Sequence, residues 1–212
     1  MDLRSSEMER VALGPGGLFY GVYPARVTDI VDPDQQGRVK VRLPGVPDTG
    51  DSNYEAWARL ATMMAGNNRG TFFIPDVDDE VLVAFEHGDI SRPFVIGGLY
   101  NGKDKPNLGN GLFNQGKVKR NGFVSRKGHK FVFFEDQSKS GIALITSDGK
   151  IKVSLNETNT EIHIECQGKV LIKAQGDMNL ESSGSLTLKG DNGVKVNSGA
   201  TVEIKGQQVK LN

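Results

Sequence analysis

The sequence contains one cysteine, Cys166, and its C-terminal part lacks proline and aromatic residues. All eight prolines lie at or before Pro106, and the last aromatic residue is Phe134. A single cysteine excludes an intrachain disulfide framework and is typical of a small structural thiol. Because proline cannot donate a backbone hydrogen bond to a sheet, its absence allows an uninterrupted stack of short strands. Without aromatic side chains, the core of such a stack can be thin.

A strong charge of one sign is also missing, since 26 basic and 26 acidic residues give a net charge of zero. A nucleic-acid track needs a stripe of positive charge, so we expect no nucleic-acid partner. No run approaches the roughly 20 apolar residues of a membrane-spanning helix. The polar residues 1–10 do not form the apolar core of a secretory signal. We therefore expect synthesis in the cytoplasm without a signal peptide.

An eight-residue repeat occupies the chain from Ile162 onward. Apolar residues recur in pairs separated by one residue, usually polar, which places each pair on one face of a short strand. The predicted core consists of Ile162, Ile164, Val170, Ile172, Met178, Leu180, Leu186, Leu188, Val194, Val196, Val202 and Ile204. Burying an aliphatic side chain is worth about 1.5–3 kcal/mol, but only where a partner covers it. The repeat therefore predicts an intertwined, triple-stranded β-helix over residues 141–212, formed by a homotrimer.

Residues 18–100 contain short apolar stretches separated by strong turns, without a helical period. We expect strands over residues 20–31, 38–43, 55–62, 71–74, 80–86 and 94–98. This pattern is typical of a small closed barrel of the oligonucleotide/oligosaccharide-binding (OB) type. A flexible arm is expected over residues 1–17 and a basic, glycine-rich connector over residues 101–140. The predicted fold class is all-β, with an OB-fold barrel followed by a trimeric β-helix needle.

Candidates for catalytic or metal-binding residues are few. His87 and the acidic run at 76–80 could supply metal ligands, but their spacing favours turns beside strands. His129 and His163 are expected to lie in solvent. No Ser-His-Asp order, nucleophile elbow or phosphate-binding loop is present, so we predict neither an enzyme nor a cofactor or metal site. The alternative function is an OB-fold protein that binds oligonucleotides or oligosaccharides, which would need aromatic and cationic side chains interleaved on one face.

Several motifs in the barrel region occur in an order and spacing that we can compare with a known family. They are Tyr23-Pro24-Ala25-Arg26-Val27-Thr28-Asp29-Ile30, Gly37-Arg38-Val39-Lys40-Val41, Trp57-Ala58-Arg59-Leu60-Ala61, Gly70-Thr71-Phe72-Phe73-Ile74-Pro75, Asp79-Glu80-Val81-Leu82-Val83-Ala84-Phe85-Glu86-His87-Gly88-Asp89, Arg92-Pro93-Phe94-Val95-Ile96-Gly97 and Tyr100-Asn101-Gly102-Lys103. Over residues 20–105 the chain resembles phage baseplate assembly protein V and the valine-glycine repeat (VgrG)-type spikes of contractile injection systems.

The resemblance implies a structural role as the central spike of a phage tail, a phage tail-like particle or a type VI secretion apparatus. Such a homotrimer caps the tube, is ejected toward the target cell and punctures its envelope. The hub region that precedes the barrel in secretion-system spikes is missing, so a separate hub protein is expected above the barrel. Some phage spikes carry a lysozyme domain after the barrel, and residues 101–140 are too few to hold one.

The end of the chain implies a further partner. Some needles of this family end in a His-x-His motif that binds iron, whereas this chain ends in Val209, Lys210, Leu211 and Asn212. We therefore predict a metal-free end at which these four residues form a docking platform. The resemblance implies that a proline-alanine-alanine-arginine (PAAR) repeat protein binds there.

Overall fold

The computed structural model describes residues 17–47, 53–109, 111–136 and 138–210. Within these ranges every regular element is a β-strand, apart from one 3₁₀ turn at Glu86–Gly88. The arm expected over residues 1–17 lies outside them except for Gly17. In the same described ranges, no helix is long and apolar enough to cross a membrane. The predicted all-β class is confirmed.

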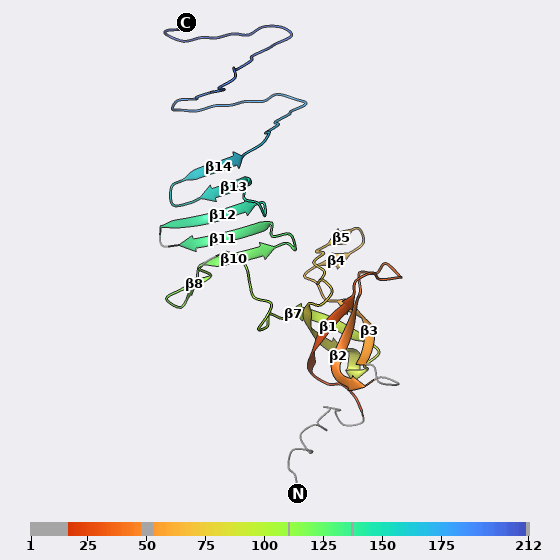
Figure 1. Ribbon diagram of the computed structural model, residues 1–212. Coiled ribbons are helices and arrows are strands. Elements are labelled where there is room, and N and C mark those ends of the chain that lie inside the picture. Colours follow the sequence, from red (N-terminus) through yellow and green to blue (C-terminus); the bar gives the residue numbers. More distant parts are fainter. Residues whose placement is uncertain (1–16, 48–52, 110, 137, 211–212) are drawn as a thin grey trace.

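Five strands close a barrel in the N-terminal part of the chain (Figure 1). They are β1 (Val22–Asp29), β2 (Val39–Pro47), β3 (Asn53–Leu60), β6 (Glu80–Phe85) and β7 (Pro93–Gly98). Their order around the barrel is β1-β2-β3-β7-β6, and β1 pairs with β6 to close it. All neighbours are antiparallel except β3 and β7. A closed barrel of five strands is consistent with the predicted OB domain.

Apolar side chains at alternate positions of the strands fill the interior of the barrel. Val39, Val41 and Leu43 of β2 are at most 1% exposed, whereas Lys40 and Arg42 between them lie on the outer wall. This inward and outward alternation is the consequence of the pleat of a strand. The same core contains Phe19, Ala25, Val27, Ala58, Val81, Val83, Phe85 and Val95.

The strand expected over residues 71–74 is absent, and this prediction is wrong. Those residues have no regular structure and follow a small hairpin of β4 (Ala65–Gly66) and β5 (Arg69–Gly70). The physical reason is that the barrel is already closed by the pairing of β1 with β6 and of β3 with β7. No free edge remains for the segment, so Phe72 and Phe73 stay exposed.

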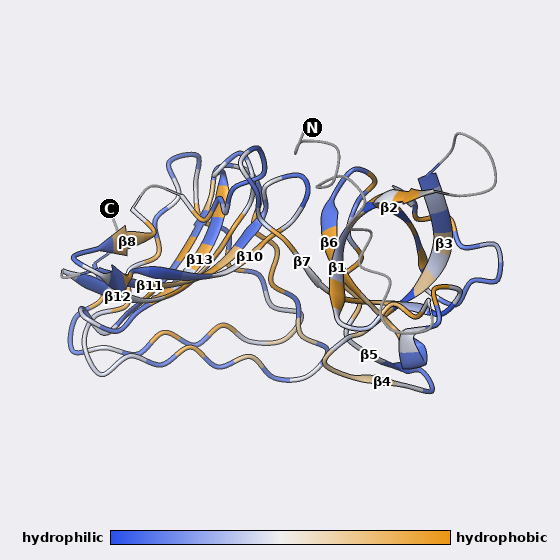
Figure 2. Ribbon diagram, turned by 90° about the horizontal axis from the view of Figure 1, so that it is seen from below, coloured by the Kyte–Doolittle hydropathy of each residue, from blue (hydrophilic) through white to orange (hydrophobic). Residues whose placement is uncertain are grey.

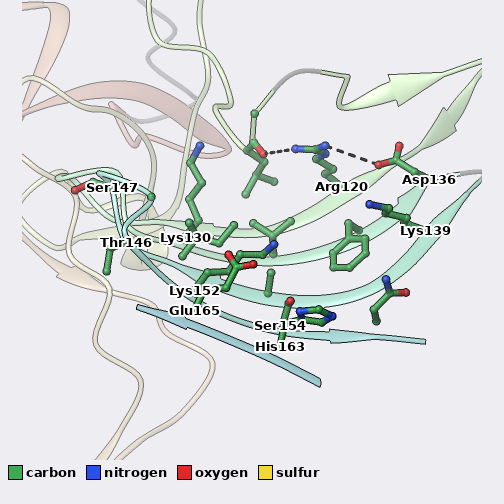
Figure 3. A pocket seen from close by; sticks show the side chains of 18 of the residues that line it. Arg120, Lys130, Asp136, Lys139, Thr146, Ser147, Lys152, Ser154, His163 and Glu165 are labelled. Carbon is green, nitrogen blue, oxygen red and sulfur yellow. Dashed lines mark hydrogen bonds and ion pairs between the residues drawn. The ribbon is translucent and has the colours of Figure 1, made fainter. Parts of the chain in front are cut away.

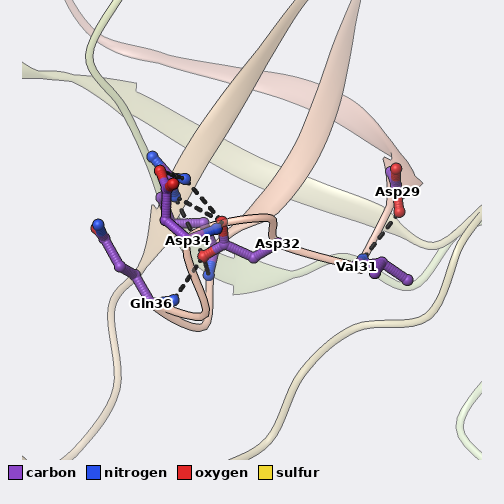
Figure 4. A network of polar contacts seen from close by, with 6 residues as sticks. Asp29, Val31, Asp32, Asp34 and Gln36 are labelled. Atoms are coloured by element: carbon purple, nitrogen blue, oxygen red, sulfur yellow. Dashed lines mark hydrogen bonds and ion pairs between the residues drawn. The ribbon is translucent and has the colours of Figure 1, made fainter.

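One turn between β1 and β2 is fixed by a buried carboxylate (Figure 4). Asp32, whose side chain is 4% exposed, accepts backbone hydrogen bonds from Asp34, Gln36 and Arg38 at 3.1, 2.8 and 3.2 Å. Its Oδ1 also lies 2.7 Å from Nη2 of the Arg38 guanidinium. The hydrogen bond from that side chain holds the pKa of Asp32 well below its usual range. The turn therefore sets the point at which β1 and β2 begin to pair.

A second sheet follows the barrel and is a simple antiparallel meander (Figure 1). Its strands are β10 (Arg120–Val124), β11 (Lys130–Asp136), β12 (Lys139–Ile145), β13 (Ile151–Asn156) and β14 (Glu161–Cys166). A small hairpin of β8 (Phe113–Asn114) and β9 (Lys117–Val118) precedes it. The sheet therefore starts inside the expected connector at 101–140, because β10 pairs with β11 and β11 pairs with β12.

Beyond β14 the chain runs through wide turns and forms no strand among residues 167–210 (Figure 1). Figure 2 shows hydrophobic and hydrophilic residues alternating along these extended segments. A strand needs a neighbour whose backbone accepts and donates its hydrogen bonds. Among the described residues, the repeats beyond β14 have no such neighbour.

A ring contact and an ion pair connect the loop that precedes β6 to the region of β10. The rings of Phe73 and Phe123 stack with centroids 5.4 Å apart and an angle of 11° between their planes. Nη1 of Arg126 lies 3.2 Å from Oδ1 of Asp76. The segment that was expected to be a strand, residues 71–74, thus contributes a contact to β10.

Candidate functional site

The second sheet has one face made of apolar side chains. Because side chains alternate along each strand, the observed register aligns the apolar side chains of neighbouring strands in two rows on this face. One row is Phe131, Leu144, Val153 and Ile164, and the other is Phe133, Ile142, Leu155 and Ile162. Phe123 extends the first row, because its ring stacks on that of Phe131 with centroids 6.2 Å apart. This apolar face is continuous from β10 to β14.

The apolar face is open to solvent in the single chain. Phe123 and Leu144 are each 53% exposed, and Ile162 and Ile164 are 73% and 66% exposed. Soluble monomers rarely leave a contiguous apolar surface of this kind uncovered. The face is therefore a candidate site for assembly.

The twelve residues predicted as the needle core lie at the surface of the single chain. Their exposed fractions range from 49% for Val202 to 73% for Ile162 and Ile172. Ile162 and Ile164 belong to β14 and join the apolar face of the sheet, whereas the other ten lie on the segments beyond Cys166. Of the predicted docking platform, Val209 is 52% exposed and Lys210 is also exposed. Leu211 and Asn212 lie outside the described residues.

The predicted core list begins at Ile162 and omits the part of the apolar face that precedes it. The omitted residues are Phe123, Phe131 and Phe133, which lie in the expected connector, and Ile142, Leu144, Val153 and Leu155, which lie within the β-helix expected over residues 141–212. The turns between β11, β12 and β13 differ in length, so these alternating residues do not follow the eight-residue spacing that defined the list.

The acidic run at 76–80 is tied into the fold by turn hydrogen bonds. Oδ2 of Asp79 accepts the backbone N–H of Asp76 at 2.8 Å, and Asp76 also pairs with Arg126. His87 has φ of 52° inside the 3₁₀ turn after β6 and is exposed. Among the described residues, no group of three or more His, Cys, Asp or Glu side chains could hold a metal ion.

His129 and His163 have contacts that position turns and strand ends. Nδ1 of His129 accepts the backbone N–H of Ser147 at 3.1 Å. Nε2 of His163 lies 3.1 Å from Oε2 of Glu161. Hydrogen bonds from Asn159 and His163 lower the pKa of Glu161. Both histidines therefore take part in local hydrogen bonding on the second sheet.

Residues 23–100 match the family model of the type VI secretion system/phage-baseplate injector OB domain. The match begins in β1 and ends just after β7, so it covers the barrel. The resemblance of the barrel region to this family, inferred from its motifs, is thereby confirmed.

The relatives that match the chain, from Pseudomonas aeruginosa and Vibrio cholerae, are much longer proteins. The type VI secretion system spike protein VgrG1a of Pseudomonas aeruginosa is 41% identical over 69 residues, which cover 32% of this chain and 11% of that protein. Spike protein VgrG3 of Vibrio cholerae is 30% identical over 132 residues, covering 61% of this chain and 13% of that protein. The actin cross-linking toxin VgrG1 of Vibrio cholerae is 32% identical over 74 residues, covering 34% of this chain and 7% of that protein.

The chain thus spans about a tenth of the length of the curated relatives that it matches. The alignment with VgrG3 is longer than the barrel and extends beyond the residues of the family match. Together these matches show that the chain carries an injector OB domain of the type VI secretion system/phage-baseplate family and is related through it to VgrG-type spikes.

Proposed function

We propose that the chain is the structural central spike of a contractile tail or injection apparatus and acts as a homotrimer. The observation that carries the proposal is the exposure of its repeat: twelve regularly spaced apolar side chains are 49–73% exposed in one chain. Covering each of them is worth about 1.5–3 kcal/mol. Identical copies of the same ribbon offer a matching surface with the same eight-residue spacing.

In the proposed trimer the apolar faces point inward and the polar faces point outward. The apolar rows of β10 and β11 carry phenylalanines, whereas the residues beyond position 134 carry none. The needle would therefore be wide near the barrel and slender toward its end. The proposed domains are the arm at 1–17, the barrel at 18–100, the connector at 101–140 and the triple-stranded β-helix at 141–212, with the upper part of the needle reaching back to β10.

The proposed partners follow from the likeness to spike proteins. A hub protein binds above the three barrels, and a PAAR-repeat protein binds the platform of residues 209–212. The envelope of the target cell is contacted transiently during puncture. The spike would be synthesised in the cytoplasm and ejected as part of a tail or tail-like particle, without catalysing a reaction or binding a cofactor or metal.

Two substitutions in one repeat test the role of the apolar pairs. Leu188→Asp places a carboxylate in the proposed core, where burial of an unpaired charge is costly, so trimers should be lost. Thr187→Asp places the same group one residue earlier, on the outward face, and should leave assembly intact. Sedimentation velocity measures both. Equal assembly of the two variants would contradict an apolar core at Leu188.

The alternative, an oligonucleotide- or oligosaccharide-binding barrel, has one observation in its favour. On the outer wall, Arg38 and Lys40 lie 5.8 and 5.7 Å from the ring centre of Trp57. Arg59 lies 5.5 Å from that of Phe94. These pairs place aromatic and cationic side chains together on one wall, as the alternative function requires. Each cation, however, covers the ring surface on which a base would stack, which argues against base binding. We expect the fluorescence anisotropy of a labelled single-stranded oligonucleotide to stay unchanged when the protein is added. If the protein is instead a monomer that binds the oligonucleotide with an affinity that falls steeply with salt, the alternative function is correct and the spike proposal is wrong.

A further inference from the structure

The polar face of the second sheet contains a trough of about 670 Å³ (Figure 3). Its floor is a row of small side chains that the register aligns across three strands, Val132, Ala143 and Ser154. These residues are only 4–6% exposed because longer side chains surround them. Small residues in the middle of the sheet and long ones on both sides create the hollow.

One side of the trough carries unpaired positive charge. Lys130 and Lys152 belong to the row that flanks the floor, with Ile145 between them and Glu165 at its end. Neither ammonium group has an ion pair among the described residues, and the same is true of Lys139 on the opposite side. Glu165 lies opposite Lys152 on the neighbouring strand, and Glu161 interacts electrostatically with Lys139. The lining as a whole holds four cationic side chains, Arg120, Lys130, Lys139 and Lys152, against the three carboxylates of Asp136, Glu161 and Glu165, so a small excess of positive charge remains.

The other side of the trough contains an arginine that is incompletely satisfied. Nη1 of Arg120 donates to the carbonyl oxygen of Leu108 at 3.4 Å, and Nη2 lies 3.8 Å from Asp136 (Figure 3). Its Nε is buried and has no hydrogen-bond partner within the described parts of the chain. A buried donor without a partner is costly, and a ligand oxygen would satisfy it. Asn156 and Asn159 line the same side and supply amide groups.

We propose that this trough binds an acidic saccharide, a sugar that carries a phosphate or a carboxylate. The apolar floor of Val132 and Ala143 accepts the C–H face of a sugar ring, and the ring of Phe134 lies beside it in the same lining. Ser154, with its buried hydroxyl on the floor, hydrogen-bonds a sugar hydroxyl. The lysines bind the anionic group through charge-assisted hydrogen bonds, which are the strong ones. An apolar surface with a few converging polar groups is the usual construction of a small-molecule site.

The accessibility of the trough in the assembled particle rests on the proposed function. With the apolar rows of the sheet facing the trimer axis, the opposite face points to solvent, and each spike presents three troughs on its outer surface. A ligand on the surface of a target cell could reach them there.

Saturation-transfer difference NMR on the full chain tests the proposal with glucose 1-phosphate, glucuronate, glucose and inorganic phosphate as probes. We expect saturable binding of at least one acidic sugar, and affinity at least about tenfold lower for glucose and for inorganic phosphate. Lys152→Gln should lower the affinity for the acidic sugar by about tenfold, which is the effect of losing one charge-assisted hydrogen bond. Lys127→Gln removes the same charge from an exposed turn outside the trough and should leave the affinity unchanged.

Several outcomes would overturn the inference. Absence of binding by both acidic sugars rejects it, as does equal weakening by Lys152→Gln and Lys127→Gln. If inorganic phosphate binds as tightly as the sugar phosphate, the trough is an anion site and does not recognise the sugar. If glucose binds with the same affinity as the acidic sugars, the lysines do not contribute to binding. Light scattering on the same samples separates the two proposals: a trimer that binds no sugar rejects the trough alone, whereas a monomer rejects the spike.

Discussion

At the scale of single residues, Asp32 shows how one carboxylate fixes a turn. It accepts three backbone hydrogen bonds and pairs with Arg38, and its side chain is 4% exposed. The sequence predicts a turn between the strands expected over residues 20–31 and 38–43, where Asp32, Pro33 and Asp34 lie. It could not predict that Asp32 and not Asp34 is the buried acceptor, because that depends on how the chain folds back onto itself.

Asp32→Asn should lower the stability of the barrel at neutral pH. The folded state lowers the pKa of Asp32 relative to the unfolded value of about 3.9, so the ionised carboxylate favours folding. That contribution is complete above the unfolded pKa and is lost as the pH falls toward the folded pKa. The difference in thermal midpoint between the native protein and the variant should therefore shrink from pH 7 to pH 3, as followed by fluorescence of Trp57.

Asp34→Asn provides the matched comparison. Asp34 is 58% exposed and makes one ion pair with the same arginine, so its removal should lower the midpoint less. If the two variants are equally destabilised at pH 7, the buried position of Asp32 is not what stabilises the turn.

At the scale of elements, the five strands of the barrel were predictable, because they complete their pairing with one another. The alternation of Val39, Val41 and Leu43 identified β2 because its neighbours belong to the same barrel. Residues 71–74 had a strand-like composition and failed because no sheet edge was free. The repeat beyond Cys166 presents the opposite case, since its pattern is regular and it pairs with no strand among the described residues. Sequence periodicity predicts which face is apolar, but not what covers it.

The close approach of β12 and β13 can be tested at Gly141. Its φ is 154°, and a Cβ atom there would lie 1.9 Å from the backbone oxygen of Leu155 on the neighbouring strand. Gly141→Ala should therefore destabilise the second sheet by about 3 kcal/mol or more. Urea unfolding followed by far-UV circular dichroism should show an earlier transition, while fluorescence of Trp57, which lies in the barrel, should not move.

Gly176→Ala is the control for this change, because no atom lies within 4 Å of its added Cβ and its φ is not positive. The two variants differ in whether the new methyl group meets a neighbouring backbone and in whether the glycine has a positive φ. A sheet that tolerates Gly141→Ala as well as Gly176→Ala would contradict the observed pairing of β12 with β13.

At the scale of the whole molecule, intertwining predicts resistance to unfolding. Each thread of the proposed needle covers its two neighbours, so unwinding any one exposes the apolar pairs of all three, and partial opening has few low-energy routes. We expect unheated samples in sodium dodecyl sulfate to migrate as trimers and boiled samples as single chains. Immediate dissociation in cold detergent would argue against intertwined threads.

The central claim, that three copies complete one another, is tested most directly by the molar mass of the full chain in solution. Light scattering coupled to size-exclusion chromatography should give three times the 23.0 kDa of one chain, independent of concentration across the accessible range. A stable mass of 23.0 kDa would contradict the account, because the exposed apolar face and repeat would then have no partner.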